Sequence, residues 1–465
     1  MISRTWPMIV ALTLAGCMVG PNYDGPPKVI SHDDFKRSNQ PETPPIATWW
    51  TGFDDAQLSA LITASLEVNP TVKIAEAHVR QARAVLGGDE AKLMPDVSAR
   101  AAYARIHLPQ GLSQMFQSNE NVNYYNAGFD ATWELDLFGG QKRAVEAAHD
   151  QEQSAEFQLA DVQVQLAAEV GQSYINLRDA QHRLDLQRQT IDIEQKMSDL
   201  TKQRYIQGTA TAIDSVRAEQ QLASSKAGIA PIQTQVDQYL DALSFLTAKE
   251  PGDLDLQLAA SKPLPLPPRE TDVGNPADLL KNRPDIRSAE RMLAASTAEI
   301  GEAKAQEFPD VNLLGTLGWG GSRPNDIGRS NTLLGVVAPV LQWHFLDFGR
   351  VQAQVSQAKA ARDETREAYR LAVLSALRDA EDSLSRYGHQ RDNMEQLQTA
   401  RDLAQKASEL TRQKYAGGTA SLIDYLDAER QRIEAEQSLA QGQAQFSNAY
   451  IALEKSLGLG WQHKT

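Results

Sequence analysis

The sequence QRYIQGTATAID, residues 203–214, returns almost unchanged as QKYAGGTASLID, residues 413–424. The offset is 415 − 205 = 210 residues, and the same offset pairs the FG dipeptide at 138–139 with the one at 348–349. Further upstream, the PDV tripeptide at 95–97 matches 309–311 at an offset of 309 − 95 = 214. Solenoid repeats are far shorter, about 20 to 50 residues. The chain therefore contains two copies of one design, which we expect to be related by a pseudo-twofold axis.

Long helical patterns flank both copies of this motif. Apolar residues keep helical spacing over 140–205, some 66 residues, which corresponds to about 99 Å at 1.5 Å per residue. After a turn at Gly208, a second helix is predicted over 211–249, and it ends before a Pro-Gly pair. The second copy repeats the two helices over 350–415 and 421–457. Helices of this length build coiled coils or the wall of a tube, because a compact globule has no room for them.

Two strand patterns precede the long helix of each copy. The first pair follows a helical pattern over 54–92, which Pro70 interrupts and Pro95 ends. Loops rich in glycine and polar residues separate the strands of each pair. The expected strands cover residues 97–106, 125–135, 311–319 and 333–345.

The clearest strand is 125–135, where apolar and polar side chains alternate strictly and aromatic residues stand near both ends. A transmembrane β-strand has this pattern, with about ten residues, an apolar outer face and a polar inner face. A half-buried strand of a β-sandwich has it too, so this alternation alone leaves both readings open.

The chain is accordingly divided into six segments. Between the two copies, the sequence KPLPLPP at 262–268 is a stiff connector that we expect to lie on the surface as a strap. The predicted segments are a signal peptide at 1–16, an extended N-terminal segment at 17–53, a first repeat at 54–250, a Pro-rich connector at 251–275, a second repeat at 276–460 and a tail at 461–465.

The composition limits the possible functions. The 465 residues include 6% aromatics and carry a formal net charge of −14, and the mean hydropathy is −0.43. A nucleic-acid partner is not expected, because phosphate binding needs a basic face. The acidic charge fits a soluble surface or an acidic lumen that favours cations. No run of 18 or more apolar residues occurs in the sequence, so no transmembrane helix is expected.

The N-terminus is typical of a short secretory signal, with Arg4, an apolar run over 8–14 and small residues before Cys17. Cys17 is the only cysteine of the chain, so it forms no internal disulfide. The sequence LAGC at 14–17 resembles a bacterial lipobox, which implies cleavage before Cys17 and attachment of acyl chains such as palmitate. Several acyl chains anchor a protein stably. Met18 replaces the aspartate that retains lipoproteins at the inner membrane, and this favours the outer membrane.

Four strands are too few to cross a membrane alone. An open sheet edge leaves unpaired N–H and C=O groups in hydrocarbon, so a spanning sheet must close. The smallest bacterial barrels have about eight strands and are filled by side chains, so two chains would give a plugged barrel. Three chains give 3 × 4 = 12 strands, enough for a lumen. The sequence therefore predicts a homo-oligomer, most simply a trimer.

The chain resembles the outer membrane factors of tripartite efflux systems, the TolC-like and OprM-like channels, and among them the NodT-type lipoproteins. The resemblance covers nearly the whole mature chain and implies an α+β membrane protein. Its expected form is a trimeric 12-stranded β-barrel, with four strands per chain, continuous with a long α-helical periplasmic barrel. The motifs that carry the resemblance, in order, are CMVGPNY at 17–23, WW at 49–50, FD at 53–54, RPD at 283–285, FPD at 308–310, FLDFGR at 345–350 and YAGGTASLID at 415–424.

The resemblance also implies a closed periplasmic tip. By position, Ile423, Asp427 and Arg430 match an apolar plug, an acidic ring and its basic partner, and Tyr415 matches an aromatic residue of the primary gate. From spacing alone, Asp427 and Arg430 would be an ordinary i,i+3 surface pair. The first copy has Arg217 and Gln220 at the equivalent positions, so the acidic ring is expected to be threefold.

The turns at Gly208-Thr209 and Gly418-Thr419 match those that contact the adaptor in this family. From the residues alone, they could equally be simple helix-loop-helix turns.

The function implied is that of a passive outer membrane channel for multidrug-type efflux in a Gram-negative bacterium. The implied partners are two further copies of the chain, a periplasmic adaptor (membrane fusion) protein, an inner-membrane resistance-nodulation-division pump and outer membrane lipid. Two alternatives remain at this stage. One is a type I secretion or metal-efflux channel of the same fold, and the other is a lipid-anchored periplasmic coiled-coil scaffold.

No enzyme is expected. The eight histidines stand in no metal-binding pattern, and the sequence contains no P-loop, nucleotide fingerprint or nucleophile motif. The glycine-rich stretch 315–321 ends a strand and opens no helix, so a phosphate-binding loop is not expected there. Neither a cofactor nor a bound metal is predicted.

Overall fold

The computed structural model describes residues 18–29, 48–107, 109–111, 121–268 and 283–461. Cys17 and the signal sequence lie outside these residues. The chain divides into two compact units, each of which takes segments from both sequence copies. Unit 1 comprises Met1–Pro27, His78–Glu156 and Ser288–Arg370, and unit 2 comprises Lys28–Ala77, Phe157–Arg287 and Leu371–Thr465.

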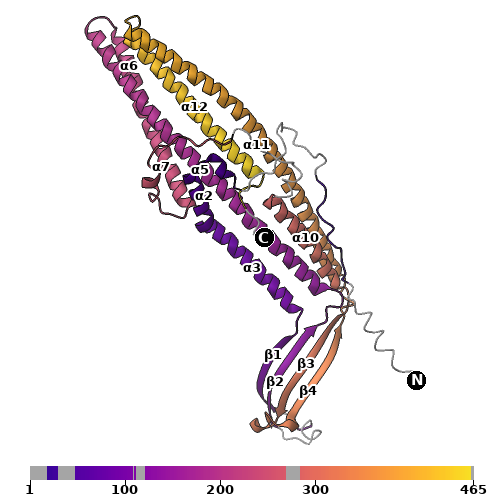
Figure 1. The fold of residues 1–465 in the computed structure, drawn as a ribbon. Coiled ribbons are helices and arrows are strands. Elements are labelled where there is room, and N and C mark those ends of the chain that lie inside the picture. Colours follow the sequence, from indigo (N-terminus) through magenta and orange to yellow (C-terminus); the bar gives the residue numbers. More distant parts are fainter. Residues whose placement is uncertain (1–17, 30–47, 108, 112–120, 269–282, 462–465) are drawn as a thin grey trace. The chain divides into compact units, whose positions relative to one another are not determined.

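The described residues of unit 1 form a four-stranded antiparallel sheet in the order β1-β2-β3-β4 (Figure 1). All four expected strands are confirmed, although the last ends at Gln342 rather than at residue 345. Two short 3₁₀ helices, η2 (Pro324–Asp326) and η3 (Ser330–Thr332), occupy the loop between β3 and β4. The strands are β1 (Asp96–His107), β2 (Asn121–Glu134), β3 (Asp310–Gly321) and β4 (Leu333–Gln342).

The helices repeat with the sequence offsets. The long helices α5 (Gly140–Ile206) and α11 (Arg350–Ala416) contain 67 residues each, and their starts differ by 350 − 140 = 210. The preceding helices α3 (Pro70–Lys92) and α10 (Pro284–Ala305) both begin at a proline, and their starts differ by 284 − 70 = 214. Proline suits the first helical position, where its missing N–H costs no hydrogen bond. Pro70 also separates α3 from α2 (Ala56–Val68), as expected.

The prediction of one continuous helix over 211–249 is wrong. The chain forms α6 (Ala212–Ala227) and α7 (Ile229–Leu246), which meet at Gly228. Pro231 lies in the first turn of α7, where it has no N–H to continue the helical ladder from α6. The second copy has Gln441 at this position (231 + 210 = 441), and α12 (Leu422–Ser456) is unbroken.

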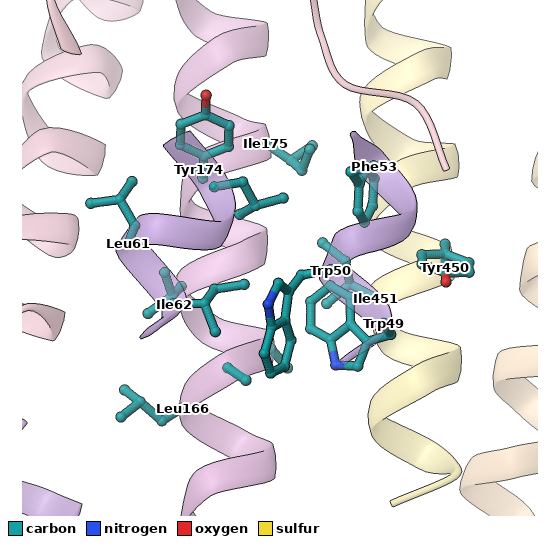
Figure 2. Close-up of a cluster of buried hydrophobic side chains, with 14 of the residues drawn as sticks. Trp49, Trp50, Phe53, Leu61, Ile62, Leu166, Tyr174, Ile175, Tyr450 and Ile451 are labelled. Atoms are coloured by element: carbon teal, nitrogen blue, oxygen red, sulfur yellow. The ribbon is translucent and has the colours of Figure 1, made fainter. Parts of the chain in front are cut away.

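The core of unit 2 is built around aromatic residues at the end of the N-terminal segment. The 3₁₀ helix η1 (Trp49–Phe53) lies between α5 and α12 (Figure 2). Trp49 and Phe53 meet the ring of Tyr450 edge to face, with ring centroids 6.4 and 5.4 Å apart. On α5, a Cβ added to Gly171 would lie 2.9 Å from the Trp49 ring, so glycine is required for this close approach.

The Pro-rich connector lies against the same unit. The Pro265 carbonyl accepts a hydrogen bond from the buried Ser447 hydroxyl at 3.0 Å, and the Pro268 carbonyl accepts one from the Tyr387 hydroxyl at 3.3 Å. A short helix, α8 (Asp255–Leu258), lies within the connector, before its proline run at 262–268. Hydrogen bonds accepted by two proline carbonyl groups therefore hold the connector on α11 and α12.

The buried carboxyl group of Glu454 is expected to make the stability of the fold depend on pH. Glu454 of α12 is 4% exposed and forms no ion pair in the described residues. Burial raises the pKa of Glu454 to about 8, although a hydrogen bond from Tyr450 partly opposes this rise. Because this pKa lies above its unfolded value, the contribution of Glu454 to stability is complete below about pH 4.5 and is lost as pH rises toward 8.

Glu454→Gln is expected to remove this loss. The difference between the folded and the ordinary pKa of Glu454 corresponds to a loss of at most roughly 5 kcal/mol in the free energy of unfolding. The gain in melting temperature of the variant over wild type should therefore be near zero at pH 4.5, grow up to about pH 8 and then level off. Thermal melting by circular dichroism between pH 4.5 and 9 measures it. A gain independent of pH would mean that Glu454 does not titrate in this range.

Candidate functional site

The two copies of the opening motif form closely similar turns at the ends of α5 and α11. Gly208 has a φ of +73° and Gly418 a φ of +71°, a conformation that glycine adopts without strain. The N–H groups of Thr209 and Thr419 each donate to the carbonyl five residues back at 2.8 Å. The hydroxyls of both threonines donate to the same carbonyls at 3.1 Å. The four predicted turn residues are therefore the helix-ending residues of two matched turns.

Each turn leads into a capped helix. Thr211 caps α6 and Ser421 caps α12, each in a reciprocal capping box with an aspartate three residues on. These hydrogen bonds lower the pKa of Asp214 and Asp424. Both aspartates therefore remain ionised at neutral pH, and each capping box fixes where the helix after the turn begins.

The predicted constriction residues form an ion-pair chain along α12. An Nη atom of Arg430 lies 2.8 Å from Asp427, and the other lies 2.9 Å from Glu434. The Gln431 side chain also donates to Asp427, at 2.9 Å. The hydrogen bond with Asp427 raises the pKa of Arg430. Asp427 thus orients Arg430, and both side chains are half-buried in the single chain.

The aromatic residue predicted for the gate has a partner on the other side of the turn. The rings of Tyr415 and Tyr425 are stacked, with centroids 6.0 Å apart and an interplanar angle of 7°. The pair joins the end of α11 to the start of α12. Ile423, the predicted apolar plug, is half-buried two residues before Tyr425. In the first copy Ser215 occupies the position of Tyr425, so no equivalent stack can form there.

The first copy differs at the constriction as well. Arg217 and Gln220, the counterparts of Asp427 and Arg430, are both exposed on α6. No ion pair of Arg217 occurs within the described part of the chain. The acidic and basic groups of the candidate constriction are therefore confined to the second copy.

A further network behind the constriction was not predicted. Glu429 accepts a hydrogen bond from Ser408 of α11 and pairs with Arg432 at 3.1 Å. Arg432 also pairs with Glu436 at 2.7 Å. The network holds the first turns of α12 on α11. The sequence carries only weak signs of it, since the i,i+3 and i,i+4 charge spacings are common on solvated helices.

One face of the sheet is polar at its centre. Arg100 of β1 pairs with Asp130 of β2 at 3.2 Å, and Thr316 of β3 donates to the same aspartate at 2.9 Å. The register aligns Asp130 with Thr316 directly. These groups lie across three adjacent strands, whereas β4 contributes the exposed apolar side chains of Leu334 and Val336 to the same face.

The opposite face of the sheet is apolar and bare. On each strand one of its residues is largely exposed, namely Val97 at 63%, Phe129 at 54%, Leu317 at 54% and Val337 at 75%. Within the described residues no second layer covers this face, and β1 and β4 each have one neighbouring strand. The reading of 125–135 as a sandwich strand is therefore not supported. No helix in the described part of the chain combines the length and apolar character needed to cross a membrane.

Two tryptophans mark one end of the sheet. The indole N–H of Trp133, at the end of β2, donates to the Leu93 carbonyl at 2.9 Å, and that of Trp343, after β4, donates to the Glu307 carbonyl at 3.2 Å. The two pairs are related by the sequence offsets, since 343 − 133 = 210 and 307 − 93 = 214. Tryptophan is typical of the membrane–water interface. The repeated pairs therefore mark the level at which the strands meet the helices.

Comparison with known proteins identifies the family. The model of the outer membrane efflux protein family matches residues 61–249 and 275–459. The chain belongs to this family. It is 28% identical over 456 residues to Nodulation protein T of Rhizobium leguminosarum bv. trifolii, covering 97% of this chain and 96% of that protein. It is 29% identical over 426 residues to the pyoverdine export outer membrane protein OpmQ of Pseudomonas aeruginosa, covering 90% and 88%.

A solved structure agrees with this membership. The outer-membrane channel OprN has a TM-score of 0.87 to this outer membrane efflux protein, with 32% identity over 96% of this chain and 100% of that one. The predicted α+β fold, outer membrane location and efflux-channel function are thereby confirmed. The family consists of channel proteins rather than enzymes. The roles of the gate residues, of the turns and of Cys17 stay predictions.

Proposed function

We propose that three copies of this chain form one passive channel whose 12 strands close in the outer membrane. The observation that carries the proposal is the bare four-stranded sheet, with a polar face around Asp130, an apolar opposite face and one partner for each edge strand. A spanning sheet with open edges is unstable in hydrocarbon, so the edges need further copies. The polar face would line the lumen, and the apolar face would contact lipid.

The channel would work with a periplasmic adaptor and an inner-membrane pump, which supplies the energy. The lipobox at 14–17 favours a resistance-nodulation-division pump. Relatives carry names that refer to different cargoes, pyoverdine export in one and toluene efflux in another. Such variety fits a passive channel whose pump selects the substrate, and a metal-efflux or type I secretion partner would use the same channel.

The periplasmic tip would be closed by residues of the second copy. In a trimer, three Asp427 carboxylates would surround the axis, and each has its own Arg430 at 2.8 Å to offset the repulsion. Ile423 would add an apolar plug, and the stack of Tyr415 on Tyr425 would hold the turn against α12. The gate would therefore be threefold and would combine a charged ring with an apolar plug.

The two matched turns would form the docking surface for the adaptor. Gly208, Thr209 and Gly418 are exposed, and Thr419 extends the same surface in the second copy. Large apolar side chains surround the first turn, with Ile206 at 76% and Val216 at 64% exposure. Exposed apolar groups at a well-defined turn favour a protein partner.

The N-terminal segment supports a lipid anchor at Cys17. Residue 19 donates its N–H to the Phe138 carbonyl at 3.1 Å, four residues beyond the end of β2. The buried Arg143 then holds the Val19 carbonyl at 3.2 Å and the Asn22 side chain at 2.7 Å. Acyl chains on the residue before Met18 would thus start next to the strand ends, where a membrane surface is expected.

The proposal is tested on the full-length protein purified in detergent. Gel analysis without and with boiling should show a heat-sensitive trimer, palmitate labelling should depend on Cys17, and planar bilayers should show discrete small conductances. A folded monomer that forms no pores would contradict the channel and favour the periplasmic scaffold. A pore-forming trimer without label would contradict only the lipid anchor.

A further inference from the structure

An open cavity in unit 1 is not used by the channel described above. Its volume is about 430 Å³, and it is formed by the N-terminal segment, α10 and α11. Gly20 and Pro21 line one side. Its charged lining residues are Lys304, Glu307, Lys359 and Arg362.

The cavity carries an excess of positive charge. Three basic side chains face one carboxylate, a net charge of 3 − 1 = +2. Arg362 has Asp363 at 3.1 Å, but neither Lys304 nor Lys359 forms an ion pair in the described residues. Two exposed lysines without an ion pair line the same cavity, and this favours a negatively charged partner.

The positive charge of the cavity is specific to the second sequence copy. At the positions equivalent to Lys304, Lys359 and Arg362 it has Glu90, His149 and Glu152, since 304 − 214 = 90, 359 − 210 = 149 and 362 − 210 = 152.

In that copy the chain neutralises its own charge. Arg83 of α3 lies 2.8 Å from Glu152, whereas the counterpart of Arg83 in α10 is Thr297 (297 − 214 = 83). One copy thus has an ion pair between its two helices, and the other leaves two lysines available to an external anion.

One end of the cavity, at Glu307, lies at the level of the strand ends. Glu307, one of its lining residues, accepts the hydrogen bond of Trp343 through its carbonyl, and β3 starts three residues later. Lys304 is in the last turn of α10. The polar headgroup layer of a bilayer is only about 5–7 Å thick on each side, and the long side chain of Lys304 can reach it from the last turn of α10.

We propose that this cavity binds a phosphate group that an anionic phospholipid presents from the periplasmic leaflet of the outer membrane. Arg362 and the two lysines supply the charge that a phosphodiester requires. Pro21, Ile300 and Val355 give the same cavity an apolar side for the glycerol end of the acyl chains. The bound lipid would hold the N-terminal segment against α10 and α11. The inference rests on the outer membrane location, and it is independent of the gate.

Native mass spectrometry of the full-length protein in a neutral detergent tests the site. With phosphatidylglycerol as probe, the variant Lys304→Gln/Lys359→Gln should bind roughly tenfold less lipid than wild type, because both unpaired cations are removed. The matched control is Lys142→Gln, an exposed lysine in the first turn of α5 that lies outside the cavity. The control and Lys304→Arg/Lys359→Arg should bind like wild type, and phosphatidylcholine should bind weakly to all of them.

The remaining outcomes are equally informative. Inorganic phosphate at millimolar concentration should not displace phosphatidylglycerol; full displacement would assign the site to a soluble phosphate and overturn the lipid. Equal lipid binding by wild type and the glutamine variant would overturn the site itself. Loss of the trimer in the glutamine variant, with the arginine variant intact, would mean that the cations contact a neighbouring chain, and this too would overturn the proposal.

Discussion

Replacing Asp427 by alanine is expected to raise the single-channel conductance roughly threefold and to weaken its preference for cations. In the chain, Asp427 holds Arg430 at 2.8 Å and accepts a hydrogen bond from Gln431 at 2.9 Å. Without the carboxylate, Arg430 keeps only Glu434, at 2.9 Å, and turns along α12 away from its present position. Three such changes around the axis would widen the opening and remove the negative ring that attracts cations.

The control for this measurement is Glu436→Ala. This residue is also a carboxylate on α12 that pairs with an arginine, Arg432, at 2.7 Å, but it lies nine residues beyond Asp427. Its removal should leave conductance unchanged, because it is not at the predicted constriction. Both variants are recorded in planar bilayers under the same salt and voltage. If Asp427→Ala conducts like wild type while the trimer is intact, the constriction lies elsewhere in the channel.

Much of the fold follows from local sequence physics. The ends of α5 and α11 are predicted to within one residue, because helical periodicity runs without interruption and a glycine with positive φ closes each turn. The strand 125–135 is found because its apolar and polar side chains alternate strictly, whereas the alternation of the two strands of the second copy is weaker and the turn-rich loop between them marks their ends. The break at Gly228 was not predicted, because hydrophobic periodicity is assessed over many residues and is insensitive to a single one such as Pro231.

The candidate site is less predictable than the fold. Asp427 and Arg430 were found through the family resemblance, since their i,i+3 spacing alone indicates nothing beyond a surface pair. The stack of Tyr415 on Tyr425 depends on the conformation of the turn between them, and hydrophobic periodicity does not predict that conformation. The basic cavity joins three segments distant in sequence. Only the comparison of Lys304 with Glu90 in the other copy could have drawn attention to it.

The largest loss of stability is expected for Arg178→Met in α5. Arg178 is 1% exposed, and its guanidinium donates to neutral oxygens and forms no ion pair in the described residues. It donates to the Gln57 side chain at 2.7 Å and to the Ala260 carbonyl at 2.8 Å, and it lies over the Tyr174 ring at 4.9 Å. Methionine would fill part of the volume but would leave the partly buried Gln57 oxygen and the Ala260 carbonyl without the guanidinium donors. The expected cost is on the order of 3–5 kcal/mol.

Arg178 also fastens the start of the connector, because Ala260 precedes the proline run that lies on α11 and α12. Its loss should therefore lower the melting temperature and also speed amide hydrogen exchange in 254–262 before the rest of unit 2 opens. Arg178→Lys should be intermediate, since a single ammonium cannot span the same acceptors. The control is Arg188→Met, an exposed arginine on the same helix whose pair with Asp185 at 3.3 Å is worth less than about 1 kcal/mol. Equal melting temperatures for the two methionine variants would show that the guanidinium of Arg178 contributes no more than a surface charge, and that the connector is held by its proline carbonyls alone.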